Sequence, residues 1–330
     1  SKSPPSAMDE AAAAAAASAT GADGAEPPPV GEGVADGDGP KKKKPKWLPL
    51  ESNPEILNGF MERVGVQGGW AFVDVLGLDP QMLQFMPQPA VAVCLLFPSK
   101  AVRKPRLEAL DGKEDWRRAP ASTFYLIQHK EFGNACGTIA AVHAMGNLAR
   151  TGIVQLQPGS PIEQFLSVAG GMSPDDAGRA LVNASELHEA SDSAAKSEKA
   201  QTKTPGRDDK VDGHFVVFVE VGGRVVELDG CMGFPIDHGA VSPEGFLQDV
   251  GAVIRDEFMA RAPDNPLFSV MALVPASAAA SGSGSGGGDL SMEDFAALYH
   301  AQVEALTGMG FPRESALEAL RASGGDVDSA

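Results

Sequence analysis

The chain has 330 residues, of which 43% are hydrophobic, and a formal net charge of −17 at pH 7. This length accommodates one sizeable domain and a smaller one. The negative charge argues against a general nucleic-acid binder, because the phosphate backbone would be repelled. The three cysteines include no CxxC pair, so we expect neither a disulfide scaffold nor a metal site, no cofactor, and a reducing compartment. The longest apolar runs are only of strand length, so we expect no association with membranes.

Two breaks in composition divide the chain. Residues 1–45 are rich in Ala, Gly, Pro and acidic residues, which predicts a disordered tail. Its end overlaps the run "KKKKPK", a candidate nuclear-import patch for which a solvated charge cluster is the alternative. We therefore expect a cytoplasmic protein, with the nucleus as a second location. Residues 277–290 are predicted to be a flexible Gly/Ser linker, which separates a main domain (46–276) from a C-terminal module (291–330).

Helices and short strands alternate within residues 46–276. Asn53 followed by Pro54 is typical of a helix start, and Gly222-Gly223 is typical of a two-residue hairpin turn. This mixture of helices and antiparallel hairpins favours an α+β fold over a doubly wound parallel sheet. Apolar spacing predicts helices over 54–64, 136–149 and from 246 onward, and strands over 70–78, 90–97, 122–127, 214–221, 224–228 and 267–274.

One polar segment interrupts this pattern. Residues 188–209, "HEASDSAAKSEKAQTKTPGRDD", contain no Ile, Leu, Val, Met, Phe, Tyr or Trp. We therefore expect that nothing in the segment packs into a core. Loops of this length inside a compact domain are usually functional or disordered, and this one directly precedes His214. A mobile lid or filter beside a reactive site is the functional interpretation.

Cys136 begins a predicted helix, where unpaired N–H groups stabilise a thiolate. A helix N-terminus contributes about 1 to 2 kcal/mol of the roughly 4 kcal/mol that full ionisation needs, so a histidinium partner is required. His214 and His238 are the candidates. His214 and Asp229 flank the hairpin turn almost symmetrically, as a base and its orienting carboxylate would. The residues alone leave open a second interpretation, in which Cys136 is a buried structural cysteine.

Five stretches follow one another in the order and approximate spacing of a family of thiol peptidases. They are "KWLPLESNPEILNGFMERVGV", "WAFVDVLGLDPQML", "NACGTIAAVHA", "KVDGHFVVFVE" and "VVELDGCMGFPIDHG". Together they resemble the ubiquitin C-terminal hydrolase family over about residues 46–276. The resemblance implies a papain-like α/β/α fold with a central antiparallel sheet flanked by helices. It also implies that Cys136 is the nucleophile, that His214 is the general acid and base, and that Asp229 orients His214.

The same resemblance implies how the protein would meet ubiquitin. The polar segment 188–209 matches the family's active-site crossover loop, which restricts the leaving group attached to the C-terminus of ubiquitin. Pro49 and Leu50, together with Leu267 and Phe268, match places where family members contact ubiquitin.

The residues before Cys136 depart from the family pattern. Members typically carry a Gln six positions before the nucleophile, and its amide helps to bind the oxyanion. Lys130 occupies that position here, and the nearest glutamine, Gln128, is eight positions before Cys136. Gln128 can serve only if two residues bulge out, and Lys130 is the alternative donor. Since losing one oxyanion donor costs about 10²–10³ in rate, a slow enzyme is one outcome.

The C-terminal module shows a second resemblance. Residues 301–330 contain two amphipathic helical patterns, the turn Met309-Gly310-Phe311 before Pro312, and the start of a third pattern. They resemble a ubiquitin-associated (UBA) domain, an all-α module of three helices that presents the Met-Gly-Phe turn to ubiquitin. The last pattern ends before the apolar residues that usually complete such a core, so we expect a truncated module. An amphipathic helical hairpin with another packing role is the alternative.

Together these observations predict a monomeric cysteine deubiquitinase. It would hydrolyse small adducts or peptide extensions from the C-terminal glycine of ubiquitin, and ubiquitin and its adducts would be its partners. A hydrolase for a ubiquitin-like protein is one alternative. A ubiquitin-binding adaptor with weak or no activity is another, and Lys130 is the reason to consider it.

Overall fold

The computed structural model describes residues 46–110, 119–242 and 244–285, and single positions between 303 and 317. The predicted tail and most of the predicted C-terminal module lie outside the described residues. None of the helices in the described part of the chain combines the length and apolar character that a membrane crossing requires.

The sheet has six strands in the order β1-β6-β2-β3-β4-β5, and every neighbouring pair is antiparallel. This confirms the predicted α+β class with a central antiparallel sheet. The strands are β1 (Trp70–Asp74), β2 (Ala92–Pro98), β3 (Gly213–Val221), β4 (Arg224–Leu228), β5 (Ile236–Ala240) and β6 (Ser269–Pro275). The helices are α1 (Pro54–Val64), α2 (Pro80–Leu83), α3 (Ser99–Leu110), α4 (Cys136–Arg150), α5 (Pro161–Ala169), α6 (Pro174–Leu181), α7 (Ser185–Ala195), α8 (Phe246–Val253) and α9 (Ala276–Ser285), with short turns η1 (Lys130–Phe132), η2 (Ile254–Phe258) and η3 (Met259–Arg261).

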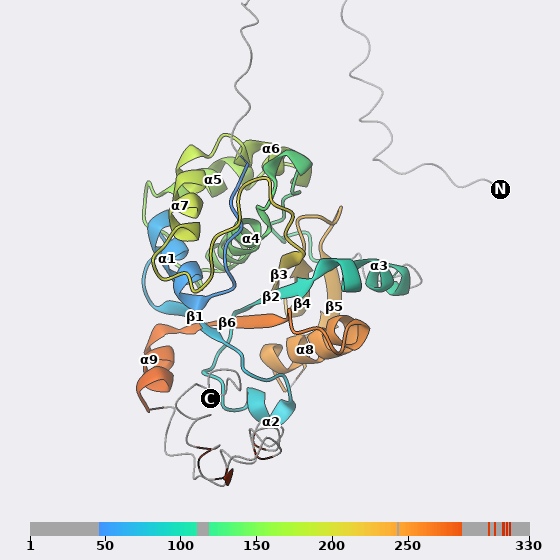
Figure 1. Cartoon of the computed structure of the whole chain (residues 1–330). Helices are drawn as coiled ribbons and strands as arrows, with labels where there is room; N and C mark the ends of the chain where they lie inside the picture. Colours follow the sequence, from blue (N-terminus) through green and yellow to red (C-terminus); the bar gives the residue numbers. More distant parts are fainter. Residues whose placement is uncertain are drawn as a thin grey trace, which may run out of the picture. The chain divides into compact units, whose positions relative to one another are not determined.

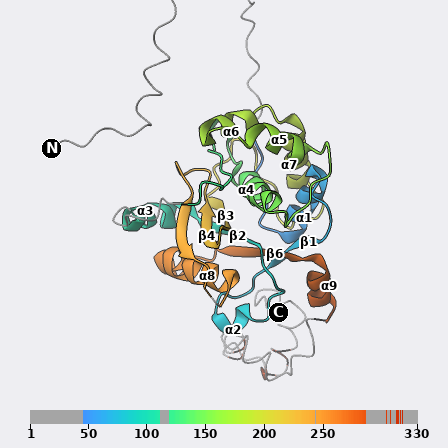
Figure 2. The ribbon, with the colours of Figure 1, turned by 180° about the vertical axis from the view of Figure 1, so that it is seen from behind.

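Helices cover the two faces of the sheet in separate layers. One layer holds α1 and α4 to α7, and the other holds α3 and α8 (Figures 1 and 2). Side chains of β3 alternate between the two cores, with Phe215 and Val217 in the larger core and Val216 and Phe218 in the smaller one. A strand buried on both faces reads as a continuous apolar run, as β3 does.

The predicted hairpin between β3 and β4 is present. Val221 pairs with Arg224, so Gly222 and Gly223 are the two turn residues. Both have positive φ, of 59° and 74°, which is the requirement of a type I′ turn and the reason for two glycines. The turn fixes the register of β3 against β4, and therefore the positions of the residues at their far ends.

One predicted strand is absent. Residues 123–129 are extended but pair with no strand. Side chains of α4 replace the strand partner: Asn147 accepts from Phe124 N at 2.8 Å and donates to Phe124 O at 2.9 Å, and His143 Nε2 lies 3.1 Å from Leu126 N. The prediction of a strand at Ser122–Ile127 was therefore wrong, because buried side chains rather than a neighbouring strand satisfy its backbone.

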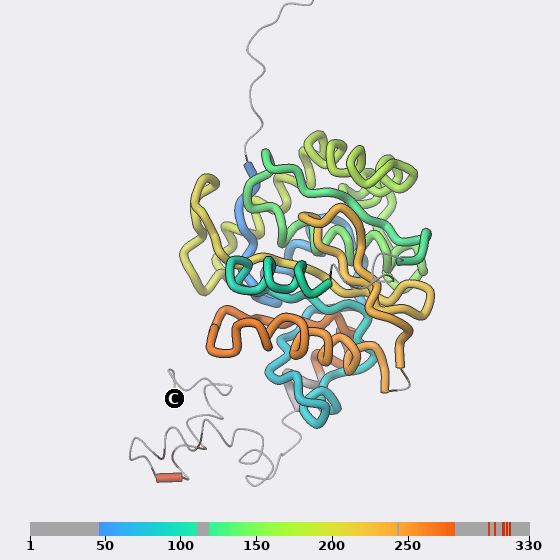
Figure 3. The backbone as a smooth tube through the Cα atoms, turned by 90° about the vertical axis from the view of Figure 1, so that its right-hand side faces the viewer, coloured from blue at the N-terminus to red at the C-terminus, as the bar shows by residue number. Residues whose placement is uncertain are grey.

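Two predicted loops are partly helical. The first eight residues of segment 188–209 belong to α7, where Ala190, Ala194 and Ala195 are buried. Small side chains allow α7 to pack closely on α1, so the expectation that nothing in the segment reaches the core was wrong. Figure 3 shows the rest, the crossover segment (196–209), as a loop beside the blue chain that enters the domain. Likewise α9 occupies most of the predicted linker 277–290, since its alanines favour a helix.

Two glycines in helices provide a matched test of the packing. A Cβ at residue 146 in α4 would lie 2.3 Å from Phe124 Cδ1, whereas a Cβ at residue 59 in α1 would meet no atom within 4 Å. We expect Gly146→Ala to lower the free energy of unfolding by about 1 to 3 kcal/mol through overpacking. We expect Gly59→Ala to raise it by about 0.5 to 1 kcal/mol through helix propensity. Urea unfolding measures both, and equal shifts for the two variants would contradict this packing.

Candidate active site

Cys136 is the first residue of α4, a helix buried on all sides from Gly137 to Leu148. A helix that is buried on every side lies inside a domain, so its N-terminus has a fixed place. The entering chain and β3 close around this end: a Cβ at residue 137 would lie 3.2 Å from both Leu50 and the ring of Phe215. Glycine after Cys136 therefore permits this close approach.

His214 and Asp229 meet at the open end of the β3–β4 hairpin. His214 is the second residue of β3, and Asp229 directly follows β4. The His214 Nε2–H donates to Asp229 Oδ1 at 2.7 Å, and both side chains are buried. The same imidazole also interacts with Cys136, since each of the two side chains shifts the pKa of the other. The structure thus brings together the three residues that the sequence singled out. His238, the other candidate partner, lies 2.8 Å from Glu227 instead.

The pKa values of Cys136 and His214 move in opposite directions. Burial alone would raise the pKa of the Cys136 thiol, but the hydrogen bond and charge of His214 outweigh it and place that pKa below the usual thiol value. Burial alone would lower the pKa of His214, but the charge and hydrogen bond of Asp229, with those of Cys136, raise it well above the usual value. This pattern favours a thiolate–imidazolium pair.

Asp229 supports this pair as an anion. Burial opposes its ionisation, but the charge and hydrogen bond of His214 lower the pKa of Asp229 to about 2. The backbone N–H of Cys231 donates to the same carboxylate oxygen at 2.8 Å. The Tyr125 hydroxyl lies 2.6 Å from the carbonyl oxygens of Asp229 and Met232, so it can donate to either. The turn after β4 is therefore held by bonds on both sides.

The other two cysteines differ from Cys136. Burial raises the pKa of Cys94 to about 12, since Cys94 lies on β2, between β3 and β6 in the sheet, and is buried in the larger core. Cys231 is exposed as a whole residue, but its thiol lies close to the surrounding protein, and this partial burial, together with the charge of Asp229, raises its pKa against the opposing charge of His214. Cys136 is therefore the cysteine whose surroundings favour the thiolate.

Gln128 and Lys130 have different surroundings. Gln128 is partly buried, and its Nε2 donates to Gly133 O at 3.1 Å while its Oε1 has no hydrogen-bond partner. Its backbone N–H donates to Gly230 O at 2.7 Å, which places Gln128 beside the turn that carries Asp229. Lys130 begins the turn η1 and is exposed. The turn η1 lies between Gln128 and Cys136, and the role of Gln128 stays a prediction.

The predicted ubiquitin-contact residues are exposed to different extents. Leu50 is buried and Pro49 partly buried, whereas Leu267 is 49% exposed and Phe268 partly buried. These positions keep their predicted role as an expectation. The predicted contacts of the C-terminal module, Met309, Gly310 and Phe311, lie outside the described residues.

A cation near Asp229 bears on metal binding. Within the described residues, His214, Asp229 and Cys231 each place one ligand atom within 4.8 Å of the others, so they could hold a metal ion. The Arg103 Nη2 donates to Cys231 O at 2.8 Å. The same nitrogen lies 4.0 Å from Asp229 Oδ2. A positive guanidinium so close to a candidate ligand disfavours a metal cation there.

Two residues at the site escaped the sequence analysis. Tyr125 and Arg103 both contact the turn after β4, although they lie more than a hundred residues before it. Neither stands in a motif that indicates such a role. Their contacts arise only when the extended segment and α3 fold onto the end of β4, which a single sequence does not reveal.

Comparisons with known proteins place this geometry in a family. The model of ubiquitin carboxyl-terminal hydrolase, family 1, matches residues 47–260, and that of the UBA/TS-N domain matches residues 299–330. Ubiquitin carboxyl-terminal hydrolase isozyme L1 of Rattus norvegicus is 38% identical over 233 residues, which cover 69% of this chain and 98% of the relative. A ubiquitin carboxyl-terminal hydrolase of Drosophila melanogaster is 38% identical over 232 residues, which cover 70% of this chain and 98% of the relative.

Solved structures share the fold. The catalytic domain of Trichinella spiralis UCH37 bound to ubiquitin vinyl methyl ester aligns with a TM-score of 0.55 and 19% identity, covering 71% of this chain and 97% of that one. The longer structure of the same protein with the same ligand aligns with a TM-score of 0.51 and 19% identity, covering 84% and 95%. Since the family model spans most of the chain and the curated relatives match over nearly their full length, the chain belongs to the ubiquitin carboxyl-terminal hydrolase family 1 of thiol-dependent deubiquitinating enzymes.

Proposed function

We propose that the protein hydrolyses small adducts or short peptide extensions at the C-terminal glycine of ubiquitin, with Cys136, His214 and Asp229 as its catalytic triad. The observation that carries this proposal is the position of His214, which hydrogen-bonds Asp229 at 2.7 Å and interacts with Cys136 closely enough to lower the pKa of its thiol. The family match supports ubiquitin as the substrate class.

Each member of the triad has one role in the proposed reaction. The Cys136 thiolate attacks the carbonyl carbon of the terminal glycine and forms a tetrahedral oxyanion. The His214 imidazolium gives its proton to the leaving group as the oxyanion collapses to a thioester. Neutral His214 then takes a proton from water as the water attacks the thioester, and collapse of the second tetrahedral intermediate releases ubiquitin and restores the Cys136 thiolate beside the His214 imidazolium. Asp229 keeps the imidazole oriented through both steps.

Gln128 is the proposed side-chain donor to the oxyanion, together with the backbone N–H of Cys136. The Gln128 amide already lies beside Gly133, just before α4, and its partly buried position limits its freedom. The exposed side chain of Lys130 lacks such constraints. A preorganised donor stabilises developing charge more than one that must reorganise, so this favours Gln128.

The crossover segment supports the proposed preference for small leaving groups. Its backbone is tied to the entering chain: Glu51 accepts from the N–H groups of Gln201 and Thr202 at 3.1 and 3.3 Å, and Asn53 Nδ2 donates to Lys199 O at 3.2 Å. A loop closed at several points resists passage of a folded leaving group.

The C-terminal module would add a second ubiquitin contact. The UBA match at residues 299–330 supports this role. A tethered second site raises the effective concentration of ubiquitin near the first one, so we propose that it strengthens binding without changing the chemistry.

The vinyl methyl ester of ubiquitin tests the proposal. Because a thiolate adds to this electrophile once ubiquitin places it correctly, we expect a covalent adduct at Cys136, located by peptide mass spectrometry. Cys136→Ala should abolish the adduct, and the matched variant Cys94→Ala, which removes a core thiol, should retain it. An adduct that survives Cys136→Ala, or none on the unchanged protein, would contradict the proposal.

Gln128→Ala and Lys130→Ala separate the two oxyanion candidates. We expect Gln128→Ala to lower kcat about 10²–10³-fold with little change in KM, because the interaction exists only once the oxyanion forms. Lys130→Ala should leave kcat nearly unchanged. Hydrolysis of a fluorogenic ubiquitin C-terminal amide measures both, and the opposite ranking would assign the role to Lys130.

A further inference from the structure

Helix α3 is hydrogen-bonded to the residue before β3 and to β4, the two strands beside His214 and Asp229. At its start, Ser99 N donates to Asp212 O at 3.0 Å and Lys100 N donates to Asp212 Oδ1 at 3.2 Å. Asp212 lies just before β3 and two residues before His214. A carboxylate at a helix N-terminus accepts hydrogen bonds from unpaired N–H groups, so this contact joins α3 to the chain two residues before His214.

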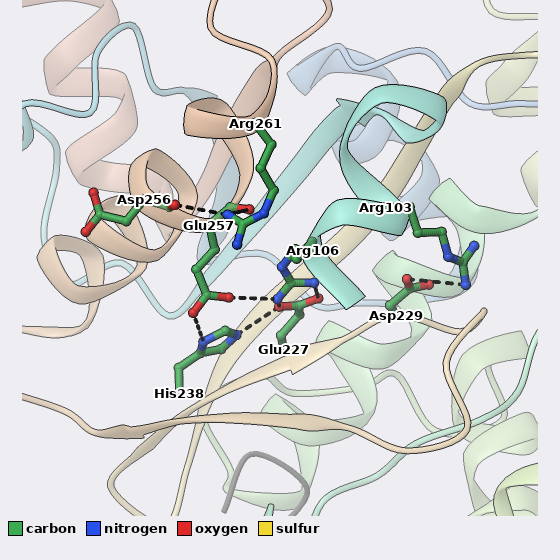
Figure 4. Close-up of polar contacts among 8 residues, drawn as sticks. All are labelled: Arg103, Arg106, Glu227, Asp229, His238, Asp256, Glu257 and Arg261. Carbon is green, nitrogen blue, oxygen red and sulfur yellow. Dashed lines mark hydrogen bonds and ion pairs between the residues drawn. The ribbon is translucent and has the colours of Figure 1, made fainter. Parts of the chain in front are cut away.

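The middle of α3 is fastened to β4 by a buried ionic cluster (Figure 4). Arg106 forms two hydrogen bonds with the Glu227 carboxylate, one of them at 2.8 Å from Nη1 to Oε1. Glu257 lies 3.3 Å from Arg106 Nη2, and His238 Nε2 lies 2.8 Å from Glu227. Bidentate pairing fixes the orientation of both partners, so α3 cannot rotate freely on β4.

Arg103 lies one turn before Arg106 and faces the turn after β4. Its Nη2 donates to Cys231 O at 2.8 Å and lies 4.0 Å from Asp229 Oδ2 (Figure 4). The other carboxylate oxygen, Oδ1, accepts from His214 and from Cys231 N. The two oxygens of Asp229 thus face different groups, and the guanidinium stands on the side that His214 leaves open.

We propose that Arg103 is a positioning residue of the hydrolase: its guanidinium holds the 229–231 turn so that Asp229 keeps its hydrogen bond with His214. This inference rests on the proposed function of the triad. Arg103 acts through Asp229 and does not touch the reacting atoms. The ion pair of Arg106 fixes α3 on β4. Arg103, one turn earlier in the same helix, is therefore held at a constant distance from Asp229.

The position of Asp229 affects Cys136 mainly through His214, because the direct charge of Asp229 on the thiol is the smallest of the causes of its pKa shift and acts in the opposite direction. If Asp229 moves away from His214, the imidazolium loses stabilisation, and so does the thiolate that depends on it. The thiolate then forms at higher pH. The acidic limb of kcat/KM, which reports thiolate formation in the free enzyme, would move to higher pH. Besides Arg103 and His214, the titratable groups that interact with Asp229 among the described residues are Cys136, His143, Cys231 and Tyr125.

The test compares Arg103→Gln with Lys104→Gln in the full chain. Lys104 is the next residue of α3, and its side chain is 85% exposed. Among the described residues, its ion pair is with Glu108, at 3.8 Å. Both variants therefore remove one positive charge from the same helix. We expect Arg103→Gln to lower kcat about tenfold, with KM unchanged and the acidic limb at higher pH. Lys104→Gln should match the unchanged protein. Arg103→Lys should give an intermediate rate, because the lysine ammonium keeps the positive charge but lacks the planar, forked guanidinium that can donate to two acceptors at once.

A second readout separates this proposal from the function on which it rests. The rate of Cys136 alkylation by iodoacetamide needs no ubiquitin, and we expect its pH dependence to shift upward in Arg103→Gln. If the unchanged protein hydrolyses no ubiquitin adduct, the proposed function fails while the alkylation shift still supports the role of Arg103. Unmoved profiles of both alkylation and activity would overturn it. So would a lower melting temperature with an unmoved acidic limb, since that result indicates a purely structural contact.

Discussion

The hydrogen bond from His214 to Asp229 is the constraint around which this structure is organised. It joins the start of β3 to the end of β4, and the register that makes it possible is set by two glycines at the opposite end of the hairpin. Because both partners are buried, the bond forms in a medium where charges interact strongly. The same bond keeps the imidazole charged, which in turn stabilises the thiolate of Cys136.

The large core brings Cys136 to this bond. Helix α4 is buried on every side, so its N-terminus has one position relative to β3. Polar side chains inside α4 then hold the extended segment before it, and that segment places Gln128 beside the turn after β4. Packing and hydrogen bonding thus constrain the same helix. A shift of α4 would break its hydrogen bonds to the extended segment as well as its contacts with the sheet.

Local patterns predicted much of this arrangement. Helix α1 begins with Asn53 capping Glu55 N, and the paired glycines fix the hairpin, because in both cases the signal and its effect are adjacent in the chain. Cys136, His214 and Asp229 were found because each stands at the end of such an element. The helical part of α7 and the contacts of Arg103 were not predicted, since they depend on surfaces that meet only in the folded chain. Small side chains in α7 made a packed helix look like a polar loop.

The central claim is that the thiolate–imidazolium pair is formed in the enzyme before ubiquitin binds. The most direct measurement is a pH titration of the His214 ring by NMR in the ubiquitin-free protein, compared with Cys136→Ala. The account predicts a His214 pKa well above its ordinary 6.5, and a lower value in Cys136→Ala because the anionic neighbour is lost. A His214 ring that titrates near 6.5 in both proteins would contradict the account.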